Sequence, residues 1–174
     1  ENSGQYNELT VSYPNFLDIR DGARSFSSLA ASDVALAGVT EGDTTRRTFM
    51  MLVSANYFDT FNTRLARGRV FTTEEERPGR PSLVVIVSDA YWRKTGSAAD
   101  SIGKTVTLSG RLFTVIGITP PGFTGQTAAI APEFWLPLSA AELLKNDFMR
   151  EGKGKLPGAR DAHELLLVGR LRRG

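Results

Sequence analysis

The chain has 174 residues, enough for one domain or for two small lobes with a buried core. Its 41% hydrophobic and 23% charged residues are ordinary for a globular protein, and its apolar runs fall far short of the ~20 residues that a membrane-spanning helix needs. The chain has no cysteine, which excludes disulfides and thiolate metal sites.

The net charge of +2 is unevenly distributed. Residues 1–43 hold seven acids and two bases, whereas residues 145–173 hold eight bases and four acids. A basic end could contact anionic lipid or nucleic acid, because binding releases counterions. The simpler interpretation is a solvated loop followed by an edge strand that its arginines protect. Nucleic acid is not an expected partner, because this region offers only Phe148 for base stacking.

The N-terminal region is predicted to hold a short strand and then a helix. Leu9, Val11 and Tyr13 alternate with polar residues, which is typical of a strand. The helix is predicted to begin around Pro14, since proline fits a first helical turn. Its apolar stripe consists of Phe16, Ile19, Ala23 and Phe26.

Two strands, residues 29–40 and 44–54, are predicted next, joined by a polar turn at residues 41–43. Asn56 can cap the short helix that follows. That helix contains three aromatic residues, which suit either a ligand-stacking platform or the core, and we favour the core. They are Tyr57, Phe58 and Phe61.

A capping box is predicted at residues 72–76, in which a glutamate side chain returns to the capping backbone. The adjacent glutamates at 74–76 resemble an acidic catalytic cluster. Adjacent side chains on a turn diverge, however, and Arg77 and Arg80 are available as partners. We therefore interpret this segment as a surface loop.

The central segment predicts a strand, a helix and a hairpin in succession. Residues 83–87 are five apolar residues, typical of a strand buried on both faces. Ser88 or Asp89 can cap a helix over residues 90–95, which Gly96 ends.

The hairpin pairs a strand around Val106 and Leu108 with a strand at residues 112–118. Ser109-Gly110 is the predicted two-residue turn.

The C-terminal third is predicted to begin with a strand at residues 133–138. Ser139 then opens a second capping box and a helix through Lys145. A loop at residues 146–160 and a strand at residues 165–171 complete the chain.

Candidate chemistry is sparse. His163 is the single histidine, and its neighbours Asp161 and Glu164 would point to alternate sides of a strand, so we predict no metal site and no catalytic site. Gly103-Lys104-Thr105 matches the end of a phosphate-binding loop, but Ala98 stands where that motif requires glycine, and a strand follows instead of a helix. We expect a tight turn there and no bound cofactor.

Three segments together resemble the MacB-like periplasmic core domain, the extracytoplasmic part of FtsX-type ABC transporter permeases. These segments are residues 53–58, 67–72 and 83–123. The amino-acid sequence at residues 89–92, 102–104 and 120–125 is similar to that of the duplicated orphan permeases common in acidobacteria.

The resemblance extends over about residues 13–138. It departs from the family at residues 96–101, where GSAADS replaces the usual Gly-x-Asp-Pro turn.

The resemblance implies an α+β fold with mixed and antiparallel sheets and short helices, arranged in two lobes. A membrane-proximal lobe would comprise about residues 1–60 and 161–174, and an inserted distal lobe about residues 61–160. Because the chain begins at Glu1 and the family continues beyond the last strand with a further helix and strand, we expect a fragment of a longer protein with an uncovered sheet edge.

The implied function is a non-catalytic extracytoplasmic domain of a permease in the inner membrane. Such a domain would couple motion of the membrane helices, driven by a separate cytoplasmic ABC ATPase, to a substrate or partner outside. A second permease copy or a periplasmic adaptor is a possible further partner. Two alternatives stay open: a soluble periplasmic module that binds a small ligand in an apolar cavity, and a hydrolase built on His163.

Overall fold

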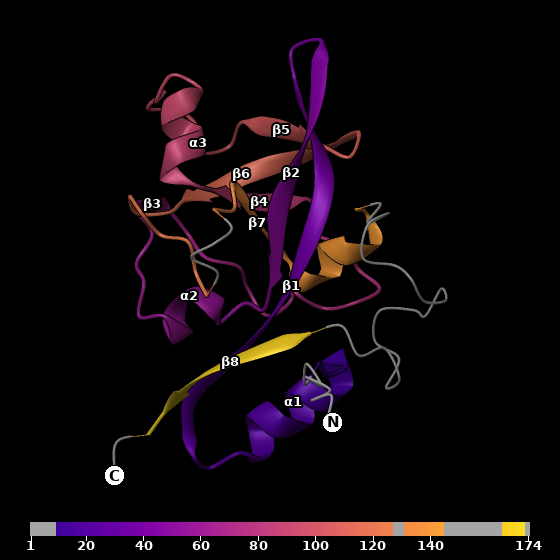
Figure 1. Cartoon of the computed structure of the whole chain (residues 1–174), viewed down its shortest axis with the longest axis vertical. Coiled ribbons are helices and arrows are strands. Elements are labelled where there is room, and N and C mark those ends of the chain that lie inside the picture. The colour runs from indigo at the N-terminus through magenta and orange to yellow at the C-terminus, as the bar shows by residue number, and fades with distance from the viewer. Residues whose placement is uncertain (1–9, 127–130, 145–164, 173–174) are drawn as a thin grey trace, which may run out of the picture.

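The computed structural model describes residues 10–126, 131–144 and 165–172. It contains short helices and a mixed eight-stranded sheet, which confirms the predicted α+β class (Figure 1). In chain order the elements are α1 (Tyr13–Gly22), β1 (Phe26–Glu41), β2 (Thr44–Val53), α2 (Tyr57–Thr60), β3 (Arg67–Gly68), β4 (Val84–Val87), α3 (Asp89–Lys94), β5 (Thr105–Leu108), β6 (Arg111–Ile118), β7 (Phe134–Pro137), the 3-10 helix η1 (Leu138–Glu142) and β8 (Leu166–Leu171).

Six of the strands close into a barrel in the order β1, β2, β7, β4, β6 and β5, because β5 pairs back onto β1. The β2–β7 and β4–β6 pairs are parallel, and the other pairs in the ring are antiparallel. Closure removes the free edges that an open sheet of these strands would expose.

The long strand β1 belongs to two parts of the molecule. Its first part, from Phe26 to Ser32, pairs with β8 outside the ring. From Ser32 to Glu41 it pairs with β2 inside the ring. Figure 1 places β8 and α1 together at the end of the molecule opposite the tip of the β1–β2 hairpin. A single continuous strand therefore connects the barrel to this end.

The barrel has a core on each side of its wall. All six barrel strands contribute to one buried cluster, with members such as Val39, Leu52 and Phe113, so this cluster fills the interior. The alternate residues of the same strands, such as Met51 and Trp135, form a second cluster outside. The aromatic residues of α2 pack on that outer cluster, which confirms their predicted role in the core.

The predicted central unit is confirmed. The Ser88 side chain accepts a hydrogen bond from the backbone N–H of Tyr91 at 2.9 Å and so caps α3. Ser109 and Gly110 both have positive φ, 47° and 75°, as a type I′ turn between β5 and β6 requires.

The predicted N-terminal strand is wrong for Tyr13, which is the first residue of α1. The helix begins here because the Ser12 side chain accepts from the backbone N–H of Asn15, and Val11 makes only an isolated bridge to Leu165. Phe26 lies on β1 and not on the helix. Leu9 lies outside the described residues.

Asn56 stands at the predicted N-cap of α2, but neither its side chain nor that of Ser139 makes the predicted capping hydrogen bond, because tertiary partners occupy both. Asn56 donates to the carbonyl of Leu29 and accepts from Ser54. Ser139 does not cap its helix, since its hydroxyl donates to the carbonyl of Glu75 at 2.6 Å, and η1 is a 3-10 helix. Lys145, the predicted end of that helix, and the predicted loop at residues 146–160 lie outside the described residues.

Candidate functional site

A buried carboxylate, Glu76, fastens α1 to the rest of the molecule. Its side chain is 1% exposed and accepts hydrogen bonds from the Tyr13 hydroxyl at 3.1 Å and from the backbone N–H of Ala55. Arg20 approaches the same carboxylate to 3.6 Å and lies over the Phe16 ring. Burial, followed by the charge of Glu76 and its hydrogen bond, raises the pKa of Tyr13 to about 12. These contacts hold the first and last turns of α1.

The interpretation of residues 74–76 as a surface loop paired with Arg77 and Arg80 is therefore wrong in part. Its last glutamate is the buried anchor described above. Glu75 pairs with Arg69 at 2.8 Å and exchanges the predicted capping-box hydrogen bonds with Thr72, although no helix follows. The basic partners are therefore Arg20 of α1 and Arg69 after β3, in place of the predicted Arg77 and Arg80.

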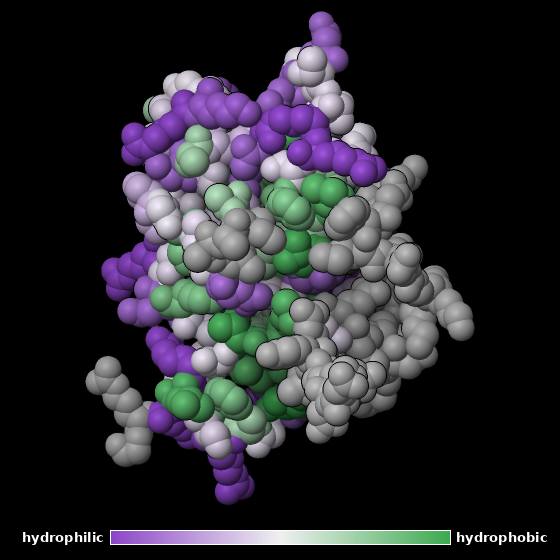
Figure 2. Space-filling model, in the orientation of Figure 1, coloured by the Kyte–Doolittle hydropathy of each residue, from purple (hydrophilic) through white to green (hydrophobic). Residues whose placement is uncertain are grey.

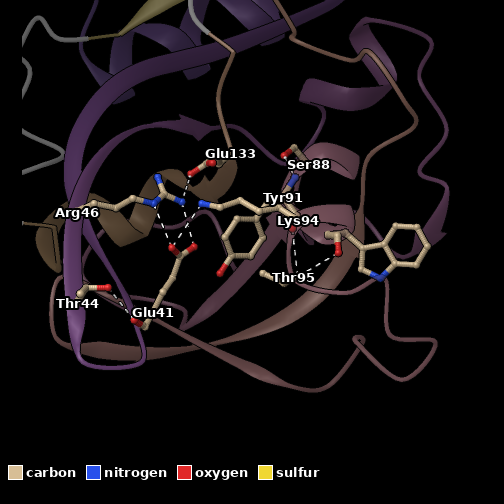
Figure 3. Close-up of polar contacts among 9 residues, drawn as sticks. Glu41, Thr44, Arg46, Ser88, Tyr91, Lys94, Thr95 and Glu133 are labelled. Atoms are coloured by element: carbon tan, nitrogen blue, oxygen red, sulfur yellow. Dashed lines mark hydrogen bonds and ion pairs between the residues drawn. The ribbon is translucent and has the colours of Figure 1, made fainter.

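One end of the barrel interior is occupied by ion pairs (Figure 3). Arg46 donates to Glu41 through two nitrogens, at 3.2 and 3.1 Å, and its Nη2 lies 2.7 Å from Glu133. Lys94 adds a longer contact of 3.5 Å to Glu41. The hydrogen bonds from Arg46 lower the pKa of the Glu41 carboxyl, and those from Glu41 raise the pKa of Arg46. Two cations thus match two anions, and the cluster links β1, β2, α3 and the start of β7 instead of offering a free acid or base.

The loop before β7 is packed through its aromatic residue. The ring of Phe123 lies 5.5 Å from that of Phe58 and 5.6 Å from that of Trp135. The Phe123 side chain is partly buried against the outer core cluster. This arrangement is packing, as expected for contacting aromatic rings.

The sequence candidates for chemistry do not assemble a site within the described residues. His163, Asp161 and Glu164 lie outside them. Gly103 takes a positive φ and leads into β5, which confirms the predicted tight turn, and Lys104 pairs with Asp100 at 2.8 Å. Within the described ranges, no group of three or more metal-ligating side chains comes together, and no helix is long and apolar enough to span a membrane.

A polar cleft of about 290 Å³ lies where the end of α1, the start of β1, α2 and the end of β8 meet. Its lining includes Arg20, Arg24, Asn56 and Arg172. Sequence reasoning missed this cleft, because β-strand pairing brings together arginines that are about 150 residues apart in the chain. The excess of basic residues near the C-terminus was the one sequence feature that pointed toward such a basic site.

Comparison with known proteins accounts for the architecture. The model of the MacB-like periplasmic core domain family matches residues 2–162. The periplasmic region of MacB from Actinobacillus actinomycetemcomitans shares 13% identity, with a TM-score of 0.64 over 95% of this chain and 82% of that one. The extracellular domain of the ABC-type transporter YknZ from Gram-positive bacteria shares 18% identity, with a TM-score of 0.62 over 94% of this chain and 75% of that one. No curated protein matches. The chain belongs to the family of MacB-like periplasmic core domains.

Proposed function

We propose that this chain is the non-catalytic extracytoplasmic domain of an ABC transporter permease, and that it passes motion of the membrane helices to a substrate or partner outside. The full permease would lie in the inner membrane, with this domain in the periplasm. A cytoplasmic ABC ATPase would drive the membrane helices, and a second permease copy or a periplasmic adaptor would be a further partner.

The observation that carries this proposal is the double pairing of β1. The 16 residues of β1 pair with β8 at one end and with β2 and β5 in the barrel at the other. α1 lies beside β8 (Figure 1) and is fixed by Glu76 to the chain after β2. A displacement applied to α1 and β8 would therefore move the barrel as a body, because packed units shift without continuous deformation.

The lobes form part of the same proposal. A membrane-proximal lobe of about residues 1–60 and 161–174 would receive the motion, and a distal lobe of about residues 61–160 would deliver it. β1 and β2, from the first range, pair with β5 and β7 of the second, so the barrel is built from both ranges and would carry the motion from one to the other.

The coding sequence on both sides of the chain tests this assignment. We expect an apolar run of ~20 residues shortly before Glu1 and further runs beyond Gly174. A cleavable signal peptide upstream, together with a stop codon directly after Gly174, would contradict the proposal and favour the soluble binding module or the hydrolase.

A further inference from the structure

The cleft between α1 and β8 has more positive charge than the residues around it neutralise. Three arginines, Arg20, Arg24 and Arg172, line it together with one carboxylate, Asp21, and Glu76 adds a second carboxylate against Arg20, which leaves an excess of one positive charge. Arg20 is engaged by Asp21 at 3.2 Å and by Glu76 at 3.6 Å. Among the described residues, the other two arginines have no carboxylate partner.

One of these two arginines is held in position by a backbone contact. The Nε of Arg172 donates to the carbonyl of Phe26 at 3.0 Å, which fixes the side chain and leaves both terminal nitrogens available within the described part of the chain. Arg24 lies in the short connection between α1 and β1 and is exposed. Both residues thus line one cleft, although they lie in segments far apart in the chain.

Planar guanidinium groups suit phosphate, because each can donate two parallel hydrogen bonds to its oxygens. Two exposed aliphatic residues lie next to lining arginines in the chain: Ile19, 37% exposed, precedes Arg20, and Leu171, 66% exposed, precedes Arg172. Figure 2 shows hydrophobic and hydrophilic surface side by side at this end of the molecule.

We infer that this cleft binds a phosphate group, either free or in the headgroup of an anionic lipid. The lipid source rests on the proposed membrane-side position of α1 and β8, whereas binding of free phosphate does not. The two sources can therefore be separated by experiment.

The test compares the 174-residue chain with the variant R24Q/R172Q and with the control R80Q/R111Q, which removes two exposed arginines elsewhere. One titration uses inorganic phosphate, followed by backbone amide NMR shifts at low ionic strength. A second uses co-sedimentation with phosphatidylglycerol vesicles and, in parallel, phosphatidylcholine vesicles. Circular dichroism checks that each variant is folded.

We expect R24Q/R172Q to weaken binding about tenfold or more, and the control to bind like the parent.

Phosphate binding with shifts around the cleft, lost in R24Q/R172Q only, supports the site. Binding to phosphatidylglycerol vesicles with the same variant dependence supports it and assigns a lipid source. Phosphate binding without vesicle binding supports the site while counting against the membrane-side position. No binding to either probe, or equal weakening by the control variant, overturns the inference.

Discussion

Glu76 makes its hydrogen bonds inside the protein, and so its removal should be costly. In Glu76→Ala the Tyr13 hydroxyl and the Ala55 N–H lose their acceptor in a region shielded from water. We expect a loss of about 3 kcal/mol in the free energy of unfolding, measured with urea. Glu74→Ala is the matched control, because Glu74 is exposed, and it should change stability by less than about 0.5 kcal/mol. Equal losses in the two variants would contradict the anchoring role of Glu76.

Tyr13 gives the same anchor a pH dependence. Its pKa of about 12 in the folded chain lies above the ordinary value of 10.0. A raised pKa means that folding favours the neutral phenol, so this stability is fully present below pH 10 and is lost as the pH rises through about 12. The slope of unfolding free energy against pH over this range should become shallower in Tyr13→Phe. Tyr57 and Tyr91, whose pKa values burial also raises, should leave a residual slope. An unchanged slope in Tyr13→Phe would show that Tyr13 does not ionise in this way.

At the scale of elements, the short strand β3 depends on close backbone contact. Gly68 has φ +77°, and a Cβ there would collide with the backbone carbonyl of Ile116 on β6. We expect Gly68→Ala to cost about 3 kcal/mol or more, since both the conformation and the contact oppose it. Gly79→Ala separates the two causes, because Gly79 has φ +82° but open space around it, and it should cost about 1–2 kcal/mol. Equal costs in urea unfolding would mean that contact with β6 contributes nothing.

In the ion cluster, Arg46 on β2 joins β1 to the residue before β7, and Lys94 joins α3 to β1. Arg46→Gln should cost about 1 kcal/mol, because bidentate pairs in a network exceed isolated surface pairs. Lys94→Gln should be nearly neutral, since the Lys94 contact is single and long, at 3.5 Å. Because Arg46 lowers the pKa of Glu41, the stability from this pair is present above pH 4.5 and is lost as the pH falls through the lowered value. The Arg46→Gln chain should therefore lose less stability on acidification, and a loss equal to that of the parent chain would contradict the role of Arg46.

Elements that depend on neighbouring residues were predictable from the sequence. The cap at Ser88 and the turn at Ser109-Gly110 are satisfied by backbone groups within three residues, and both are confirmed. Side chains with distant partners were not predictable. Buried Glu76 accepts a hydrogen bond from Tyr13, 63 residues away, and the Ser139 hydroxyl donates to a carbonyl 64 residues away. Periodicity carries no information about such pairs.

At the scale of the whole molecule, the strands were predicted better than their arrangement. Alternating and continuous apolar patterns located β1, β2, β4, β5, β6 and β8. The closure of the barrel rests on β1 pairing with β5 and on β2 pairing with β7, which join segments far apart in the sequence. The fold class came from the family resemblance, and the arginine-lined cleft came from the structure alone.

The proposed transmission of motion requires α1 and the barrel to move together. The most direct measurement is a pair of spin labels at Ile19→Cys on α1 and Asp43→Cys at the β1–β2 turn, in the proposed permease together with its proposed ATPase and with other cysteines removed. A third label, placed on a membrane helix in a separate sample with Asp43→Cys, reports movement of the domain against the membrane. We predict that the Ile19–Asp43 distance is the same without nucleotide and with bound ATP, while the distance from Asp43 to the membrane helix changes. A change in the Ile19–Asp43 distance, or no change in either distance, would contradict the account.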